Sequence, residues 1–163
     1  MAYRNANQQD IDGLRALALA SYGRLKPQLT EKNWEKMKTV LSVEETFPDL
    51  VRYCHAFVYE EEGQLLGMAF LVPSGNPTKI YSKETSYIRM VGVHPDAGGK
   101  GIAQHLTTLC IDKARELGET TISLHSAELM HAARHIYEKL GFLKIRLLDE
   151  HYGLKYWLYQ LHL

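Results

Sequence analysis

A strand, a glycine-rich turn and a long amphipathic helix follow one another directly in the middle of the chain. Residues 86–94 are typical of a strand that ends at Pro95, and apolar residues recur at helical spacing over 101–117. Three of the four residues 98–101 are glycines, so successive amides can point into one concavity beside a helix start of partial positive charge. The segment predicts an anion-binding turn. On the glycines alone, a flexible turn without a ligand is an equally open interpretation.

Further strands and helices surround this segment, and their order sets the fold class. Residues 65–72 are apolar on both faces apart from Gly67, which predicts a central strand. Within a broken helical stretch at 30–50, Ser42 followed by Glu45 predicts a capping box. The other expected elements are a strand at 3–6, a helix at 10–25, strands at 55–60 and 64–72 around a hairpin turn at 61–63, a strand at 121–125, a helix at 130–140, and strands at 143–148 and 155–161. The order predicts a mixed sheet flanked by helices, an α/β arrangement in the broad sense.

Length and composition fit one compact domain at residues 1–163. The chain is 45% apolar and 23% charged, as is usual for a globular protein. Nineteen basic and nineteen acidic side chains balance to a formal charge of zero, which gives no support for binding nucleic acid or a membrane through bulk charge. No apolar run approaches the about 20 residues of a membrane-spanning helix, and the first ten residues lack a secretory signal. We therefore expect a cytoplasmic protein.

Cysteine and histidine usage gives no strong disulfide or metal signal. Cys54 and Cys110 both lie within apolar patterns, so we expect two buried, reduced thiols. His131 and His135 stand at i, i+4 spacing with His125 close by, a spacing that can bind zinc. The His-Glu-x-x-His signature is absent, so we expect exposed helix histidines and no metal site.

Two motifs resemble those of the GNAT N-acetyltransferase superfamily. The first is the family's Val-x-Pro-x-x-Arg-Gly-x-Gly-Ile-Gly/Ala pattern, and the second is its fifth strand and fourth helix, here LHSAELMHAARHIYEKLGF at 124–142. The positions that match the first pattern are Val93, Pro95, Gly99, Gly101, Ile102 and Ala103. The resemblance covers roughly residues 86–142. It implies an α/β fold, α+β in the strict sense: a mixed, mostly antiparallel sheet of six or seven strands, about four flanking helices, and a splay between the fourth and fifth strands.

The resemblance also implies a site for acetyl-CoA. Main-chain groups of Val91 and Val93, on either side of Gly92, would pair with the pantetheine arm as if it were an added strand. The pyrophosphate would lie in the turn and helix start formed by Gly98, Gly99, Lys100, Gly101, Ile102, Ala103 and Gln104. Two positions depart from the family: Gly98 replaces the usual Arg, and Met130 stands where many members have an Asn that touches the cofactor.

The implied reaction is direct attack of a primary amine on the thioester in a ternary complex. A lysine-like amine has a pKa of about 10.4, so only on the order of one molecule in a thousand is neutral at pH 7. The reaction therefore needs a proton acceptor and an acid for the leaving thiolate. Tyr137 shares a helical stripe with Met130, Ala133 and Leu140, so it faces inward. Packing as a buried tyrosine is the alternative, and the resemblance implies that Tyr137 is the acid.

The base and the acceptor are left open. Tyr87 stands about where the family often has a Glu, and Glu84, His125 and Glu128 are nearby candidates. The resemblance implies an acceptor pocket lined by 22–43 and by the turn between the last two strands, which permits a small-molecule or peptide amine and selects none. A non-catalytic acyl-CoA-binding module is the alternative function. A nucleotide-binding loop is disfavoured by the missing Gly-Lys-Ser/Thr. A homodimer is also left open.

Overall fold

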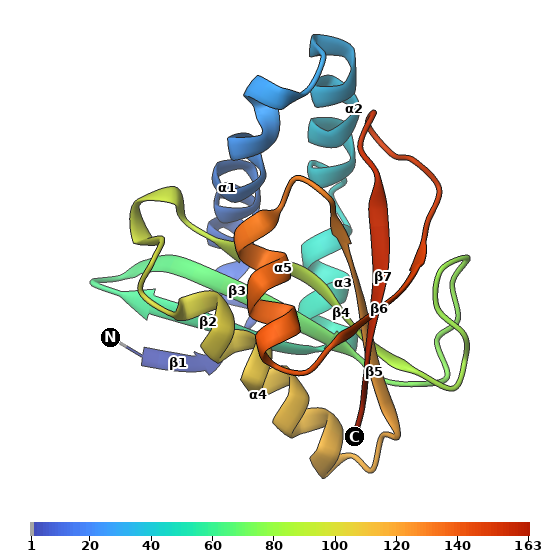
Figure 1. Cartoon of the computed structure of the whole chain (residues 1–163). Coiled ribbons are helices and arrows are strands. Elements are labelled where there is room, and N and C mark those ends of the chain that lie inside the picture. Colours follow the sequence, from blue (N-terminus) through green and yellow to red (C-terminus); the bar gives the residue numbers. More distant parts are fainter. Residues whose placement is uncertain (1) are drawn as a thin grey trace.

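A seven-stranded sheet forms the centre of the computed structural model, which describes residues 2–163 (Figure 1). The strands are β1 (Ala2–Asn5), β2 (His55–Glu61), β3 (Gln64–Val72), β4 (Ser86–Val93), β5 (Thr121–Ala127), β6 (Leu143–Leu147) and β7 (Tyr156–His162). Their order is β1-β2-β3-β4-β5-β7-β6, and every neighbouring pair is antiparallel except the parallel pair β4–β5. This mixed, mostly antiparallel sheet confirms the predicted fold class.

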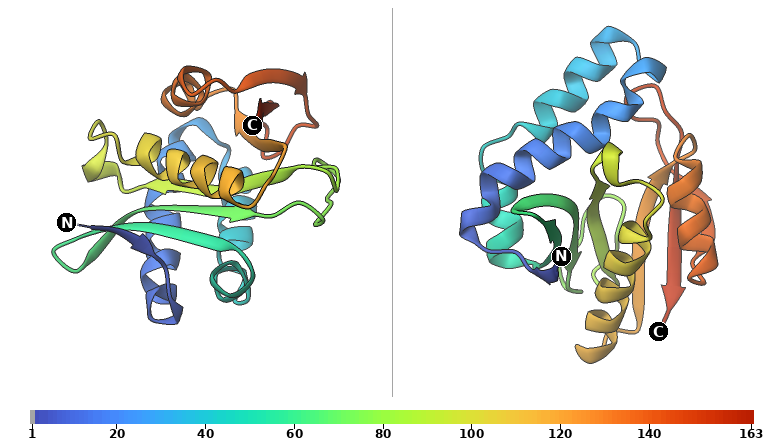
Figure 2. Two further views of the ribbon diagram at one scale, coloured as in Figure 1. Left: turned by 90° about the horizontal axis from the view of Figure 1, so that it is seen from below. Right: turned by 90° about the vertical axis from the view of Figure 1, so that its left-hand side faces the viewer.

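Within residues 2–163, five α-helices cover the two faces of the sheet. They are α1 (Ile11–Tyr22), α2 (Glu31–Leu41), α3 (Thr46–Tyr53), α4 (Ile102–Glu116) and α5 (His131–Lys139), with short 3-10 segments η1 (Gln8–Asp10), η2 (Gly23–Gln28) and η3 (Pro95–Ala97). Helices α1, α2 and α3 pack on one face and α4 and α5 on the other (Figure 2). There is one helix more than the expected four or so, because the stretch at 30–50 divides into α2 and α3. No helix within residues 2–163 is long and apolar enough to cross a membrane.

Each face of the sheet has its own hydrophobic core, and β3 contributes to both. Met68 and Phe70 belong to the core under α1, α2 and α3. Ala69 and Leu71 belong to the core under α4 and α5. All four are fully buried, and burial of a side chain the size of Phe70 contributes about 1.5–3 kcal/mol. Burial on both faces confirms that β3 is a central strand.

The predicted capping box at Ser42 and Glu45 is wrong. Ser42 follows the last turn of α2, and its hydroxyl donates to the carbonyl of Lys38 at 2.7 Å. Glu45 precedes α3 without a capping hydrogen bond from its side chain. The cause is the free carbonyls at the end of α2, which offer a nearer partner to the serine hydroxyl than the next helix does.

The two cysteines are free thiols in different surroundings. Cys110 lies on the buried face of α4 and is fully buried, whereas Cys54 follows the last residue of α3 and is only half-buried. The prediction of a buried thiol is right for Cys110 and wrong for Cys54. Burial raises the pKa of both thiols and so favours their neutral forms.

Candidate functional site

A pocket of about 500 Å³ opens where β4 and β5 separate. The two strands pair only at Ser86–Ile122 and Tyr87–Ser123, and no further pair joins them along the rest of β4. This is the splay that was expected between the fourth and fifth strands. Because an interrupted sheet leaves a gap between its two faces, the pocket can be lined from both cores.

Successive side chains of a strand point to opposite faces of the sheet, so each pocket-lining residue of β4 and β5 can be assigned to one face. Arg89 pairs with Phe70 of the core under α1–α3, so it lies on that face. His125 alternates with Leu124, which belongs to the opposite core with Ile88. The side facing α5 therefore carries Ile88 and Leu124, and the side facing α1 and α2 carries Arg89 and His125. The pocket connects the two faces of the sheet.

A β-bulge lies at the edge of this pocket. The pairing of β3 with β4 shifts between Met68 and Phe70, so that Met90 and Val91 together face Ala69. Met90 has a φ of 60°, which is uncommon for a residue other than glycine. Bulges bend a strand and leave one residue out of the ladder, and they are frequent beside functional sites. No sequence signal marks this bulge, since Met90 continues an apolar strand pattern.

The predicted anion-binding turn leads from the end of β4 into α4. His94 accepts a hydrogen bond at Nδ1 from the amide of Asp96 at 3.1 Å and so holds the short segment η3. Gly99 and Gly101 have φ of +78° and +77°, which glycine adopts without strain. Gly101 precedes α4 without a side-chain cap, so the first amides of the helix are left for another partner.

Two lysine side chains lie in or near the turn. Lys100 is exposed within the turn itself. Lys139, near the end of α5, donates to the side-chain carbonyl of Gln104 at 3.4 Å. Sequence reasoning missed Lys139, because its approach depends on how α5 packs beside α4. Ile102 is buried in the core and Ala103 is half-buried, so these two residues face the turn chiefly through their backbone.

The expected strand edge for a pantetheine arm already has one partner. The amide of Val93 donates to the hydroxyl of Ser21 on α1 at 3.2 Å. A Cβ at Gly92 would lie 2.9 Å from Met68 Cε and 3.2 Å from Ser21 Oγ, so α1 packs closely at this position. A ligand that pairs with the Val93 amide must share or replace the Ser21 hydroxyl.

Tyr137 lies in the pocket wall with Met130 and Ala133, so the predicted inward stripe of α5 reaches the site. Its side chain is 6% exposed. Burial raises the pKa of Tyr137, with smaller contributions from Tyr22 and Cys110. The phenol therefore keeps its proton at neutral pH and is available as a donor.

The candidate bases occupy unequal positions. Glu84 and Glu128 are exposed and do not line the pocket. Tyr87 is buried and its ring stacks on Tyr81, with 4.2 Å between the ring centroids. His125 alone of these candidates lines the pocket.

His125 is joined to a tyrosine that the sequence did not single out. The hydroxyl of Tyr81 lies 2.6 Å from His125 Nδ1. Burial raises the pKa of Tyr81, so its phenol keeps the hydrogen that it shares with Nδ1. His125 is exposed toward the open pocket, yet desolvation by the atoms packed around its ring, followed by the charges of His151 and Arg89, lowers its pKa to about 4. His125 is therefore a neutral imidazole at pH 7 and a weak base.

The stretches expected to form the acceptor pocket and the histidines weighed as metal ligands lie in different positions relative to the pocket. The two stretches that the resemblance implies for the acceptor do reach the pocket; the residues that line it are Tyr22, Arg24, Leu25, Gln28, Met37, Val40, Leu41 and Tyr152. His131 also lines it, whereas His135 is exposed elsewhere on α5. Throughout residues 2–163, no three His, Cys, Asp or Glu side chains come together as a metal site would require.

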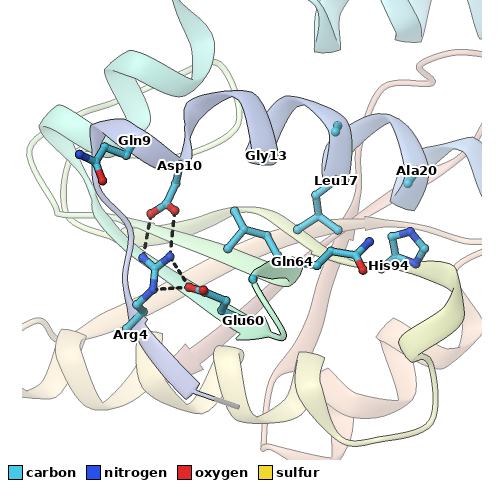
Figure 3. A pocket seen from close by; sticks show the side chains of 12 residues that line it. Arg4, Gln9, Asp10, Gly13, Leu17, Ala20, Glu60, Gln64 and His94 are labelled. Atoms are coloured by element: carbon cyan, nitrogen blue, oxygen red, sulfur yellow. Dashed lines mark hydrogen bonds and ion pairs between the residues drawn. The ribbon is translucent and has the colours of Figure 1, made fainter.

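A second hollow, of about 640 Å³, lies between α1 and the β2–β3 hairpin (Figure 3). Arg4 spans it, donating to both carboxylate oxygens of Asp10 at 2.8 and 2.9 Å and to Glu60 at 2.6 and 2.9 Å. The Arg4 guanidinium lowers the pKa of Asp10 below its ordinary value. The charges of Arg4, Asp10 and Glu60 satisfy one another, so none of these three ionic groups is left unpaired in the hollow.

The sequence profile of the acetyltransferase (GNAT) family matches residues 17–142. The chain belongs to this family. It is 34% identical over 101 residues to a mycothiol acetyltransferase of Cellulomonas flavigena, an alignment that covers 58% of this chain and 28% of that protein. The chain thus spans little more than a quarter of the length of this protein and of a second curated mycothiol acetyltransferase that it matches.

Two solved structures share the fold along almost the whole chain. A GCN5-related N-acetyltransferase from Rhodopseudomonas palustris has a TM-score of 0.79 at 18% identity, covering 99% of this chain and 95% of that one. The yncA protein from Salmonella typhimurium, solved with its cofactor acetyl-CoA, has a TM-score of 0.66 at 20% identity, covering 99% and 93%. The predicted superfamily is confirmed.

Proposed function

We propose that this protein transfers the acetyl group of acetyl-CoA to a primary amine, with both substrates bound together. The observation that carries the proposal is the pocket that connects the two faces of the sheet at the splay of β4 and β5. One side carries the buried Tyr137 and Val91, which lies two residues before the end of β4 and the turn into α4, and the other side opens toward α1 and α2. Two ligands that enter from opposite faces can meet there without competing for one opening.

The residues around the turn fit a CoA pyrophosphate. The left-handed Gly99 and Gly101 keep side chains away from the concavity, and the uncapped amides of α4 favour an anion. Lys100 and Lys139 would add positive charge. Val91 and Val93 would receive the pantetheine arm, with the Ser21 hydroxyl giving way at the Val93 amide. Bound acetyl-CoA supplies an activated thioester that a neutral amine attacks directly.

Tyr137 would protonate the leaving thiolate. As the carbon–nitrogen bond forms and the carbon–sulfur bond breaks, the sulfur takes the phenolic proton, and the phenolate regains a proton from water in the pocket. The amine nitrogen loses its proton to water. His125, whose pKa lies at about 4, is too weakly basic to hold that proton at neutral pH. We infer that the acceptor reacts as the free amine present in solution.

Tyr137→Phe tests the acid. General acid catalysis typically contributes about 10²- to 10⁴-fold, so we expect kcat to fall by that factor with little change in acetyl-CoA affinity. Tyr159→Phe is a matched control, because its buried ring lies 6.3 Å from that of Tyr137 and does not line the pocket. Full turnover by Tyr137→Phe would remove Tyr137 from the mechanism.

The proposed function itself is tested by calorimetry with acetyl-CoA, CoA and ATP, followed by a screen of amines for thiol release. We expect binding of acetyl-CoA and CoA in preference to ATP, and thiol release with at least one amine. A failure to bind acetyl-CoA at millimolar concentration would overturn the proposal. Binding without thiol release for every amine would favour the non-catalytic acyl-CoA-binding module.

A further inference from the structure

The side of the pocket that faces α1 and α2 carries positive charge and aromatic surface. Arg24 and Arg89 are the two arginines of the lining, and Tyr22, Tyr152 and Tyr156 supply aromatic walls. None of the described side chains that line the pocket is an aspartate or a glutamate. A site for a polycationic acceptor would be expected to hold carboxylates, so this lining disfavours an acceptor of that kind.

Arg89 is the charge most clearly directed at this space. Its side chain is exposed, and within the described part of the chain no carboxylate oxygen lies within 4.0 Å of its guanidinium. Its positive charge acts to lower the pKa of groups on several elements around the pocket, including Tyr22, Tyr81 and His125. Its field therefore reaches across this side of the pocket.

The position of Arg89 separates it from the phosphates of the proposed cofactor. It lies four residues before Val93, the end of β4, which corresponds to about 13 Å along a strand. The anion-binding turn begins beyond that point, and the pantetheine arm between them carries no charge. Arg24 is a weaker candidate, because its Nε donates to the carbonyl of Ser21, close to the proposed pantetheine edge.

We propose that the acceptor is a small primary amine that also carries a carboxylate, as an amino acid does, and that Arg89 binds this carboxylate. The proposal rests on the acetyltransferase function given above. A guanidinium pairs with a carboxylate through two parallel hydrogen bonds, which fixes the orientation of the acceptor as well as its affinity. The tyrosine walls fit an apolar or aromatic side chain. Polyamines and lysine-rich peptides meet like charge and find no carboxylate.

The test compares matched pairs of acceptors in the wild type, in Arg89→Gln and in the control Arg115→Gln. The pairs are phenylalanine with phenethylamine and leucine with isoamylamine, which differ only in the carboxylate. Arg115 is exposed on α4 beside Asp112 and does not line the pocket. Because an α-amino group is less basic than an alkylamine, the decisive quantity is the change in the kcat/KM ratio of each pair between variants.

We expect Arg89→Gln to reduce this ratio by about 10- to 100-fold, the usual effect of losing a charge-assisted hydrogen bond, and to leave acetyl-CoA affinity unchanged. Arg115→Gln should keep the wild-type ratio. If Arg89→Gln keeps the wild-type kcat/KM ratio, the role of Arg89 is overturned while the acetyltransferase function stands. A wild type that prefers the decarboxylated amine or a polyamine would overturn the acceptor class.

A binding measurement separates this proposal from the proposed function. In the presence of CoA, phenylalanine should raise the melting temperature of the wild type more than phenethylamine does, and Arg89→Gln should remove the difference. This readout needs no turnover. Equal shifts for the two compounds in the wild type would refute carboxylate recognition even if acetyl transfer to some amine were observed.

Discussion

Alanine substitutions at Gly98, Gly99 and Gly101 should change the stability of the protein in different directions, although the three glycines look equivalent in the sequence. Gly99 and Gly101 have φ of +78° and +77°, whereas Gly98 has φ of −65°. A Cβ at Gly98 would meet nothing closer than the Pro95 carbonyl oxygen at 3.7 Å, and one at Gly99 or Gly101 would meet nothing within 4 Å. Contacts therefore cannot explain any difference between the three variants, and only the backbone conformation can.

The magnitude follows from two opposing contributions. A residue with a Cβ costs roughly 1–2 kcal/mol in the left-handed region. Replacing glycine by alanine where the conformation is compatible stabilises the fold by about 0.4–1 kcal/mol, through the reduced entropy of the unfolded chain. For a chain of this length, 1 kcal/mol shifts Tm by about 2–4 °C. Gly98→Ala should raise Tm slightly, by up to about 4 °C, and Gly99→Ala and Gly101→Ala should each lower it.

The assay is thermal and urea unfolding of the three variants without any ligand, so that the backbone is measured apart from cofactor binding. Calorimetry with acetyl-CoA then reports whether the turn keeps its shape. Equal destabilisation by Gly98→Ala and Gly101→Ala would refute the assignment of the left-handed conformation. So would a stabilising Gly101→Ala.

Two further predictions concern packing and pH. Gly67→Ala would place a Cβ 2.5 Å from Ile102 Cγ2 and 2.8 Å from Leu106 Cδ1. Such overpacking should lower the free energy of unfolding, measured with urea, by about 1–3 kcal/mol. A loss below about 0.5 kcal/mol would contradict the close approach of α4 to β3. With the pKa of His125 at about 4 and that of Tyr22 raised to about 12, neither group changes charge between pH 6 and pH 9. Below the pKa of the acceptor amine, the wild-type kcat/KM should therefore rise about tenfold per pH unit, in proportion to the fraction of free amine. An inflection near pH 6–7 would indicate that a side chain acts as the base.

Local patterns predicted most of the elements and the glycine-rich turn between β4 and α4. The turn depends on a strand end, two left-handed glycines and a helix start that are consecutive in the chain, so the sequence contains all of its determinants. The hairpin at 61–63, the central strand β3 and the inward face of α5 were predictable for the same reason. The Ser42–Glu45 capping box failed because a second local partner, the Lys38 carbonyl, competes for the serine hydroxyl.

The parts that sequence reasoning missed depend on contacts between distant residues. Tyr81 and His125 are 44 positions apart, and Tyr81 lies in a loop without a motif. Arg89 belongs to a strand whose alternation indicates only which face it occupies, while its lack of a carboxylate partner depends on every element around the pocket. The bulge at Met90 likewise reflects the fit between β3 and β4. No periodicity in the chain marks such features.

Because β4 and β5 are paired only at one end, a small rotation between them at that end would move the far end of β4 by a larger distance. Only two residue pairs connect these strands, and buried polar side chains strengthen them: Ser86 Oγ donates to the Thr121 carbonyl at 2.7 Å, and Thr85 Oγ1 lies 2.8 Å from Ser123 Oγ. Val93 lies about 20 Å farther along β4, so a rotation of about 5° at the paired end would displace it by about 1.7 Å. Misplacement by about 1 Å can cost 10²-fold in rate. Substitutions at this pivot would thus alter turnover without touching either substrate.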